Sequence, residues 1–326
     1  MRIYSIIIPV YNRPDELDDL LASLCRQTYV HFEVIVVEDG STVPARAVVE
    51  RYRNRLDMCY LVIENSGPGI ARNRGAERAR GEYLLILDSD VTLPAAWLEQ
   101  VHDALRHYPV DAFGGPDRAH PSFTPVQRAI NYAMTSFLTT GGIRGGRRKL
   151  DTFYPRSFNM GIKREVYHAL GGFSGARYGE DIDFSLRIVE AGYRVRLFPA
   201  AWVYHKRRIS LWRFFHQVRH SGEARIWLSR SHPGSLKAVH CLPAVFVLVV
   251  LLSLAGSFFS LYCAVPLAVY SFLLFIDATS RNKGDLWVGF LSTLASFTQL
   301  LGYGTGFWRA LTSPRVRRDE RPCKPA

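Results

Sequence analysis

The chain has 326 residues, of which 48% are hydrophobic, so it can form one large domain or two ordinary ones with a substantial core. Its net charge of +12 indicates an anionic partner, such as nucleic acid, phosphate groups or an anionic membrane surface. The five cysteines are odd in number and widely spaced without a C-x-x-C pair, which gives no indication of a zinc site or a disulfide framework.

The first part of the chain alternates strand and helix patterns. Apolar runs predict strands at 3–8, 34–37, 60–63 and 83–87, and the segments between them predict helices at 14–27, 44–55 and 69–80. Apolar strands separated by helices are typical of a parallel sheet covered on both faces. Because "IYSIIIPVYN" runs directly into the first strand, we expect no signal peptide and a catalytic part that stays in the cytosol.

Polar motifs follow each of these strands, where an open parallel sheet binds its ligands. They are "PVYNR", "EDGS", "NSGPG" and "DSD". In the last of them Asp88 and Asp90 are two residues apart, a spacing that in a strand puts both side chains on one face. Their carboxylates would suit Mg²⁺ or Mn²⁺, although a D-x-D taken by itself is also common in turns and helix caps.

The segment before this motif does not match a known phosphate loop. A dinucleotide fingerprint that starts at Gly67 and Gly69 would need a third glycine at the position of Arg72, and no G-K-[ST] is present. We therefore expect a helix start with small residues that pack on the sheet and basic side chains near the ligand edge.

The composition changes sharply near residue 239. No charged residue occurs from Cys241 to Ile276, and a single straight helix of that length would span about 54 Å, well beyond the hydrocarbon thickness of about 30 Å. We expect two membrane helices, at roughly 241–259 and 266–280. The uncharged segment at 286–308 also has the length to cross, and we favour a third crossing there over a re-entrant or interfacial segment, although the basic tail that follows opposes it. The alternative is a buried helical hairpin in a soluble protein.

A basic segment precedes these helices. Residues 206–230 hold seven basic side chains and one acidic one, and an apolar stripe is formed by Leu211, Phe214, Phe215 and Val218. This pattern predicts a basic interfacial helix near 209–229 on anionic lipid. The alternative is a helix that packs on the catalytic domain, and both arrangements can hold at once. We expect a catalytic domain at 1–238, a membrane region at 239–312 with two or three helices, and a basic tail at 313–326.

Residues 3 to about 230 resemble a family 2 glycosyltransferase with the GT-A fold, an α/β fold with a Rossmann-like, mostly parallel sheet flanked by helices. The matching pieces are "SIIIPVYNRPDEL", "VIVVEDGST", "GPGIARNRGAERARGEYLLILDSD", "FNMGIKREVYHALGGF", "YGEDIDFSLRIVEAGYRV" and "VYH". The resemblance implies a metal-dependent, inverting, hexosyltransferase-like enzyme that uses a nucleotide-sugar donor, above all a UDP-sugar.

The resemblance also implies roles for residues of these motifs. Those expected to bind the donor are Pro9, Tyr11, Arg13, Asp39, Arg72 and Asp88. Asp90, Asp88 and His205 would hold a divalent cation, Mg²⁺ or Mn²⁺. One departure is Glu38 beside Asp39, where the family commonly has two aspartates.

Glu180 and Asp181 form a second carboxylate pair. Acidic residues in the first turn of a helix often only cap free N–H groups. The resemblance instead implies a general base, which we assign to Asp181 with Glu180 as second choice, while Asp183 is expected to pair with Arg187.

The expected acceptor is lipid-linked or a saccharide, in the synthesis of a surface polysaccharide or glycolipid, and the region 117–150 is the expected acceptor-side loop. The location implied is the inner (plasma) membrane, with several crossings and a cytoplasmic catalytic domain. The Q-x-x-R-W motif of processive synthases is absent after Gln217.

Two alternatives stay open. A membrane nucleotidyltransferase would share the nucleotide and metal chemistry, and a nucleic-acid-binding protein would explain the charge. We find no nucleic-acid-binding module and expect no nucleic acid as partner.

Overall fold

The computed structural model describes residues 4–141, 153–176 and 178–313. Positions 142–150 of the expected acceptor-side loop and nearly all of the basic tail lie outside the described residues, while 117–141 of that loop are described and include two helices. Contacts divide the described chain into two compact units, which are 4–118 with 153–205, and 119–141 with 206–313. This division does not follow the boundary expected at residue 238, because residues 119–141 and 206–238 join the C-terminal helices.

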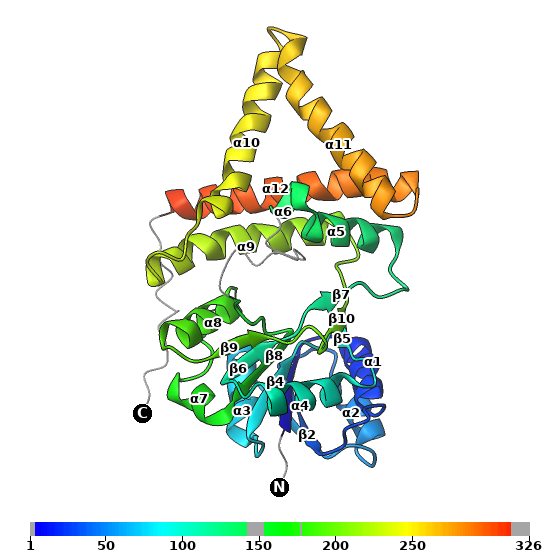
Figure 1. Ribbon diagram of the computed structural model, residues 1–326, viewed down its shortest axis with the longest axis vertical. Coiled ribbons are helices and arrows are strands. Elements are labelled where there is room, and N and C mark those ends of the chain that lie inside the picture. The colour runs from blue at the N-terminus through cyan, green and yellow to red at the C-terminus, as the bar shows by residue number, and fades with distance from the viewer. Residues whose placement is uncertain (1–3, 142–152, 177, 314–326) are drawn as a thin grey trace. The chain divides into compact units, whose positions relative to one another are not determined.

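The first unit is built on a mostly parallel sheet of seven strands (Figure 1). In spatial order these are β3 (Met58–Ile63), β2 (Phe32–Asp39), β1 (Tyr4–Val10), β4 (Tyr83–Leu87), β8 (Asn159–Lys163), β6 (Ala112–Gly114) and β9 (Val195–Leu197). Only β8 among them runs antiparallel to its neighbours β4 and β6. The four strands expected from the apolar runs are confirmed as β1 to β4.

Helices cover both faces of this sheet, as expected. They are α1 (Pro14–Leu24), α2 (Arg46–Tyr52), α3 (Pro68–Arg78), α4 (Trp97–His107), α7 (Arg164–Ala169) and α8 (Glu180–Glu190). Alternate strand residues point to opposite faces: Ile6 and Ile8 pack with α1, α2 and α4, while Ile7 packs with α3, α7 and α8. The three helices predicted before residue 80 therefore lie where the sequence placed them.

A small second sheet lies beside the ligand edge. It contains β5 (Val91–Thr92), β10 (Val203–His205) and β7 (Asp117–Arg118). In the antiparallel pairing of β10 with β5, His205 lies opposite Val91. This register brings the end of β10 next to the D-x-D turn, although more than 110 residues separate them in the sequence.

The second unit is helical. Its elements are α5 (Pro125–Thr135), α6 (Phe137–Thr140), α9 (Leu211–Ser231), α10 (Ala238–Ser257), η1 (Leu261–Ala264), α11 (Val265–Arg281) and α12 (Leu286–Thr312). Helix α12 packs along α9 through glycines that bring the two backbones together. A Cβ atom at Gly222 would lie 2.1 Å from the carbonyl oxygen of Tyr303, and one at Gly306 would lie 2.0 Å from that of Arg219. Any larger side chain at either position would force the helices apart.

The apolar stripe of α9 faces protein in this structure. Phe214 and Val218 are buried in a cluster with Ala129 and Ile130 of α5 and Leu291 of α12. Through Phe214 and Val218 the helix packs on α5 and α12, so part of the stripe has a protein partner. Contact of the helix with anionic lipid stays a prediction.

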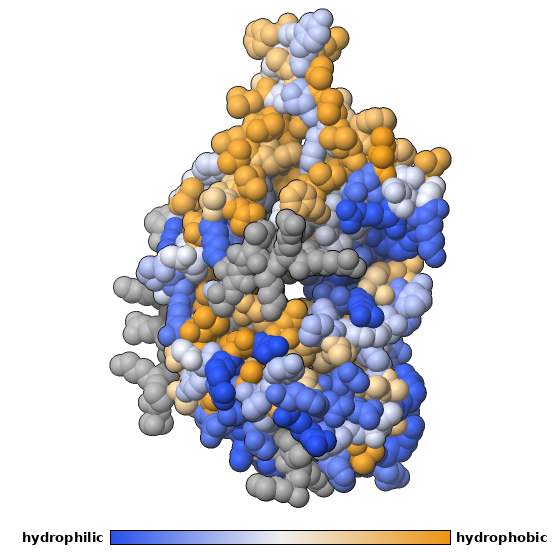
Figure 2. All heavy atoms as spheres, in the orientation of Figure 1, coloured by the Kyte–Doolittle hydropathy of each residue, from blue (hydrophilic) through white to orange (hydrophobic). Residues whose placement is uncertain are grey.

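Helices α10 and α11 form the apolar hairpin expected from the sequence. Helix α10 and the segment Leu261–Arg281, which joins η1 to α11, are long and apolar enough to cross a membrane, and only 11% of the most apolar part of each is buried within the protein. Figure 2 shows that hydrophobic side chains predominate on the visible surface of the hairpin. At its tip Phe258 and Phe259 are 91% and 92% exposed. A core hairpin of a soluble protein would be mostly buried, so that alternative does not describe these helices.

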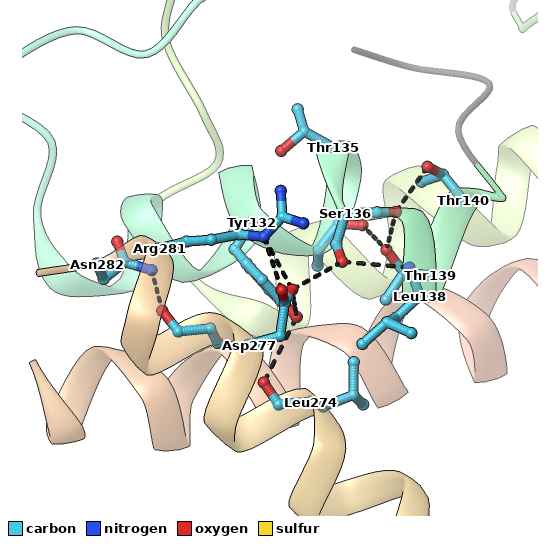
Figure 3. Close-up of polar contacts among 12 residues, drawn as sticks. Tyr132, Thr135, Ser136, Leu138, Thr139, Thr140, Leu274, Asp277, Arg281 and Asn282 are labelled. Atoms are coloured by element: carbon cyan, nitrogen blue, oxygen red, sulfur yellow. Dashed lines mark hydrogen bonds and ion pairs between the residues drawn. The ribbon is translucent and has the colours of Figure 1, made fainter. Parts of the chain in front are cut away.

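A polar cluster ties the base of the hairpin to α5 (Figure 3). The hydroxyl group of Tyr132 donates to Asp277 at 2.7 Å, and Arg281 donates to the same carboxylate at 2.9 Å. Asp277 is the first charged residue after the uncharged stretch. Its charge is thus satisfied by partners at the point where α11 joins the helical unit.

Candidate functional site

The candidate site lies at the carboxyl edge of the seven-stranded sheet, within the first unit. The parallel strands β1, β2 and β4 end together there, and antiparallel β8 begins there, with Asn159 opposite Leu87. The motifs after these strands therefore meet although they are far apart in the sequence, as the doubly wound topology requires.

Asp88, Asp90 and His205 come together as a candidate metal site. One ligand atom of each lies within 4.8 Å of the others, and Nε2 of His205 is 3.2 Å from Oδ1 of Asp90. Two carboxylates and one imidazole are ligands that Mn²⁺ and Mg²⁺ accept, so the residues fit the expected ion.

The reason expected for this convergence was wrong. Strand β4 ends at Leu87, and Asp88 to Asp90 form a turn in which the N–H group of Val91 donates to the carbonyl oxygen of Asp88. The two aspartates are thus brought together by a turn and by β10 next to β5, rather than by the two-residue period of a strand.

Arg13 contacts the metal candidates directly. Its Nη1 atom lies 2.9 Å from Oδ2 of Asp90 and 3.0 Å from Oε2 of Glu16. Burial disfavours the charged guanidinium, but the two carboxylates outweigh it and raise the pKa of Arg13. The arginine expected to line the nucleoside pocket therefore lies beside Asp90 in this structure.

Arg72 joins the two carboxylate motifs. Its side chain is 3% exposed, and its two terminal nitrogens each donate at 2.8 Å, one to Asp88 and one to Glu180. Burial opposes the charge, yet these two partners raise the pKa of Arg72. Because both terminal nitrogens are engaged and the group is buried, Arg72 holds Asp88 and Glu180 in place, and its contact with a donor diphosphate stays a prediction.

Glu180 and Asp181 begin helix α8 and differ in their surroundings. Glu180 is buried, and that burial, with the neighbouring Asp181 charge, raises its pKa despite Arg72. Burial also opposes the charge of Asp181, but Arg156, at 2.6 Å from Oδ2, outweighs it and holds the pKa of Asp181 below its ordinary value. Asp181 is therefore the ionised, more accessible carboxylate of the pair.

Asp183 has the structural role expected for it, since it pairs with Arg187 at 2.9 Å within α8.

The expected donor residues at β1 and β2 also reach this edge. Tyr11 is 48% exposed just beyond β1, and Pro9 lies half-buried within the strand. The carboxylate of Asp39 accepts from the N–H groups of Ser66 and Gly67 at 2.7 and 3.0 Å, and so fixes the turn into α3.

Glu38, the departure from the family pattern, is buried and points away from this turn. It accepts from the N–H group of Ala45 at 2.7 Å and from the hydroxyl group of Tyr60. The carboxylate of Glu38 thus makes structural contacts within the first unit.

Several residues of the site were not foreseen from the sequence. Asn12, at φ 54°, accepts from the N–H groups of Thr42 and Val43 and so joins the loops after β1 and β2. Arg156 contacts Asp181, and Phe158 stacks on the His205 ring with centroids 4.9 Å apart. The sequence holds only weak signals for two of these residues. Asn12 stands in the "YN" pair before the first helix, and Arg156 stands two residues before "FNMG".

Comparisons with known proteins agree with this architecture. The family model described as "Glycosyl transferase family 2" matches residues 5–171, just over half of the chain. The putative teichuronic acid biosynthesis glycosyltransferase TuaG of Bacillus subtilis is 41% identical over 91 residues, which are 27% of this chain and 36% of that protein. The chain thus spans about a third of that relative.

Two solved structures share the fold. Mannosyltransferase PcManGT from Pyrobaculum calidifontis, in complex with GDP-Man and Mn²⁺, matches with a TM-score of 0.63 and 19% identity over 90% of this chain and 86% of that one. Staphylococcus aureus TarS 1–349 in complex with UDP-GlcNAc matches with a TM-score of 0.50 and 20% identity over 96% of this chain and 93% of that one. With the family match over residues 5–171, the sheet order and the motifs at its edge, the chain belongs to glycosyl transferase family 2 and has its GT-A fold.

Proposed function

We propose that the protein is a membrane-associated, inverting glycosyltransferase that moves a sugar from a nucleotide-sugar donor to a lipid-linked or saccharide acceptor. The observation that carries this proposal is the meeting of Asp88, Asp90 and His205 with the Glu180–Asp181 pair through Arg72, at the ligand edge of a family 2 fold. A metal-diphosphate subsite and a base are the two parts that such a transfer requires.

The reaction follows from these parts. The hydroxyl oxygen of the acceptor forms a bond to the anomeric carbon while the bond from that carbon to the diphosphate oxygen breaks. The electron pair leaves with the nucleoside diphosphate, and the hydroxyl proton passes to the carboxylate of Asp181. Attack opposite to the leaving group inverts the anomeric configuration.

Asp88, Asp90 and His205 would hold a divalent cation in this reaction. When bound, the ion supplies positive charge for the departing diphosphate. Arg72 keeps Asp88 at this subsite and Glu180 beside the base, and the ring of Phe158 orients His205.

The fold relatives guide the choice of donor. The two solved structures named above hold GDP-Man and UDP-GlcNAc, and TuaG is named for teichuronic acid synthesis. We propose a nucleotide-sugar donor of this kind, a UDP-sugar first, and a role in the synthesis of a surface polysaccharide or glycolipid.

A donor screen tests this proposal and separates it from a nucleotidyltransferase. Membranes that contain the protein should transfer label from the sugar of one UDP- or GDP-sugar to an endogenous acceptor, in the presence of Mn²⁺ or Mg²⁺. Label in the nucleotide half should stay in solution. Transfer of the nucleotide half would contradict a glycosyltransferase, and membranes from cells with Asp181→Asn provide the background.

We further propose that α10 and α11 anchor the protein as two membrane crossings. Support comes from their exposure, from the uncharged stretch between Cys241 and Ile276, and from the charged pair Asp277 and Arg281 where that stretch ends. At 1.5 Å per residue, helices of this length approach the hydrocarbon thickness of about 30 Å.

The third crossing favoured by the sequence at 286–308 is not part of this proposal. Helix α12 is not among the helices of the described chain that are apolar enough to span, and Ala295, Ser296 and Gly306 on it are buried against protein. Figure 1 shows α12 running beside α9 at the base of the hairpin. We therefore place α12, with α9, on the cytoplasmic side of the membrane, which the positive-inside rule also prefers.

Cysteine labelling in intact cells distinguishes the two topologies. In a chain with Ser in place of Cys25, Cys59, Cys241 and Cys263, we expect a membrane-impermeant maleimide to leave Cys323 unlabelled until lysis. As a control, Ser260→Cys at the hairpin tip, in a chain with Cys323 also replaced, should be labelled without lysis. Labelling of Cys323 in intact cells would restore the third crossing.

A further inference from the structure

We propose that Arg156 is an anion-binding residue of this site, which exchanges its partner Asp181 for a phosphate group of a substrate. The phosphate is either in the diphosphate of the donor or in the acceptor. The inference rests on the proposed transferase function, because it takes Asp181 as the base.

The backbone around Arg156 is fixed at the site. The hydroxyl group of Ser185, in α8, donates to the carbonyl oxygen of Pro155, and the N–H group of Asn159 donates to the carbonyl oxygen of Arg156 at 3.1 Å. The segment is thus tied to the helix that carries Asp181 and to the start of β8. Because the backbone is held on both sides of Arg156, its guanidinium group can change partner without a rearrangement of the fold.

Arg156 has hydrogen-bond donors to spare. Among the described residues the one hydrogen-bond partner of Arg156 is Asp181, which accepts from Nε at 2.6 Å. The side chain of Arg156 is 35% exposed. The two terminal nitrogens therefore remain for a second anion, and their planar fork matches a phosphate or carboxylate group.

The other two arginines of the site face other carboxylates. Arg72 is buried, with both terminal nitrogens on Asp88 and Glu180, and Arg13 donates through Nη1 to both Asp90 and Glu16. Arg156 is the arginine in contact with Asp181, so a phosphate that enters beside the candidate base would meet it there.

The charges around Arg156 support an exchange of anions. Burial opposes its charge, but Asp181 above all, with Glu180 and Asp117, raises the pKa of Arg156, so the guanidinium stays ionised. A phosphate bound by the two terminal nitrogens would share the guanidinium charge that Asp181 now meets through Nε, and can replace Asp181 as its counter-ion. Asp181 would then lose the partner that holds its pKa low and become a better proton acceptor at the moment the substrate is bound.

Calorimetry on the full-length protein in detergent tests the inference. Wild type, Arg156→Gln and Arg156→Lys are titrated with UDP, GDP and inorganic pyrophosphate in the presence of Mn²⁺, and KM values for acceptor are measured by sugar transfer. The matched control is Arg196→Gln, which removes the same charge from a side chain that stacks on Tyr108 at 3.8 Å. Unchanged melting temperatures show that the variants are folded.

If the phosphate is that of the donor, Arg156→Gln should weaken diphosphate binding by about 10- to 100-fold, since a hydrogen bond to a charged group is lost. If Arg156 binds a phosphate group of the acceptor, Arg156→Gln should bind diphosphate like wild type, and its KM for acceptor should rise by a similar factor. In either case Arg156→Lys should fall between wild type and Arg156→Gln, and Arg196→Gln should equal wild type.

The inference is overturned if Arg156→Gln lowers kcat while leaving both diphosphate affinity and acceptor KM unchanged, because Arg156 would then only position Asp181. Failure of the proposed function looks different, since the wild-type protein would then transfer no sugar from any donor tested.

Discussion

Asp181→Asn is expected to lower the rate of sugar transfer by about 10²- to 10⁴-fold, the usual contribution of a positioned general base. The change keeps the shape of the side chain but removes the proton acceptor. Its other contacts, with Arg156 and with the N–H group of Ile182, are at the edge of the donor subsite, so donor binding should be largely retained.

The measurement is initial-rate transfer at saturating donor, together with donor affinity by calorimetry. Glu180→Gln is the informative comparison, because Glu180 is buried and held by Arg72. We expect Glu180→Gln to lower the rate of transfer, because Arg72 loses one of its two charged partners. Intact transfer in Asp181→Asn with complete loss in Glu180→Gln would move the base to Glu180.

Asp90→Asn is expected to abolish divalent-ion-dependent turnover. Asp90 lies in the turn between Asp88 and β5, faces His205, and would supply a charged ligand oxygen that the amide replaces with a neutral one. Mn²⁺ binding, followed by electron paramagnetic resonance without substrate, should weaken in step with activity. Excess EDTA should silence the wild-type enzyme.

Asp103→Asn on α4 removes the same charge outside the site and should bind Mn²⁺ like wild type. Because Arg13 keeps Glu16 as a partner when Asp90 is neutral, we expect the variant to stay folded. Full activity of wild type in EDTA, or undiminished Mn²⁺ binding by Asp90→Asn, would remove Asp90 from the metal site.

The sequence by itself determined the architecture of the first unit. Apolar runs such as 83–87 and the helices between them are local patterns whose period and length are set by the backbone. Parallel strands joined by helices leave few topologies, and their carboxyl ends must share one edge. The meeting of the β1, β2 and β4 motifs was therefore predictable, as was the apolar hairpin after residue 238.

Tertiary structure decided what local patterns do not contain. The sequence placed Arg72 near the ligand edge, and only the fold shows that α8 and the D-x-D turn put a carboxylate on each of its terminal nitrogens. The apolar stripe of α9 looked suited to lipid, but α5 and α12 cover it. An apolar face shows only that it needs a partner, and the partner that covers it comes from chain segments far away on both sides in the sequence, α5 and α12.

The same reason explains why Arg156 was missed. It precedes its strand by three residues in a segment without a periodic pattern, and its partner Asp181 is 25 residues further along the chain. The pairing exists because antiparallel β8 starts at the edge where α8 also begins. Sequence could place the two carboxylate motifs at that edge, and only the folded chain could show which cation each one faces.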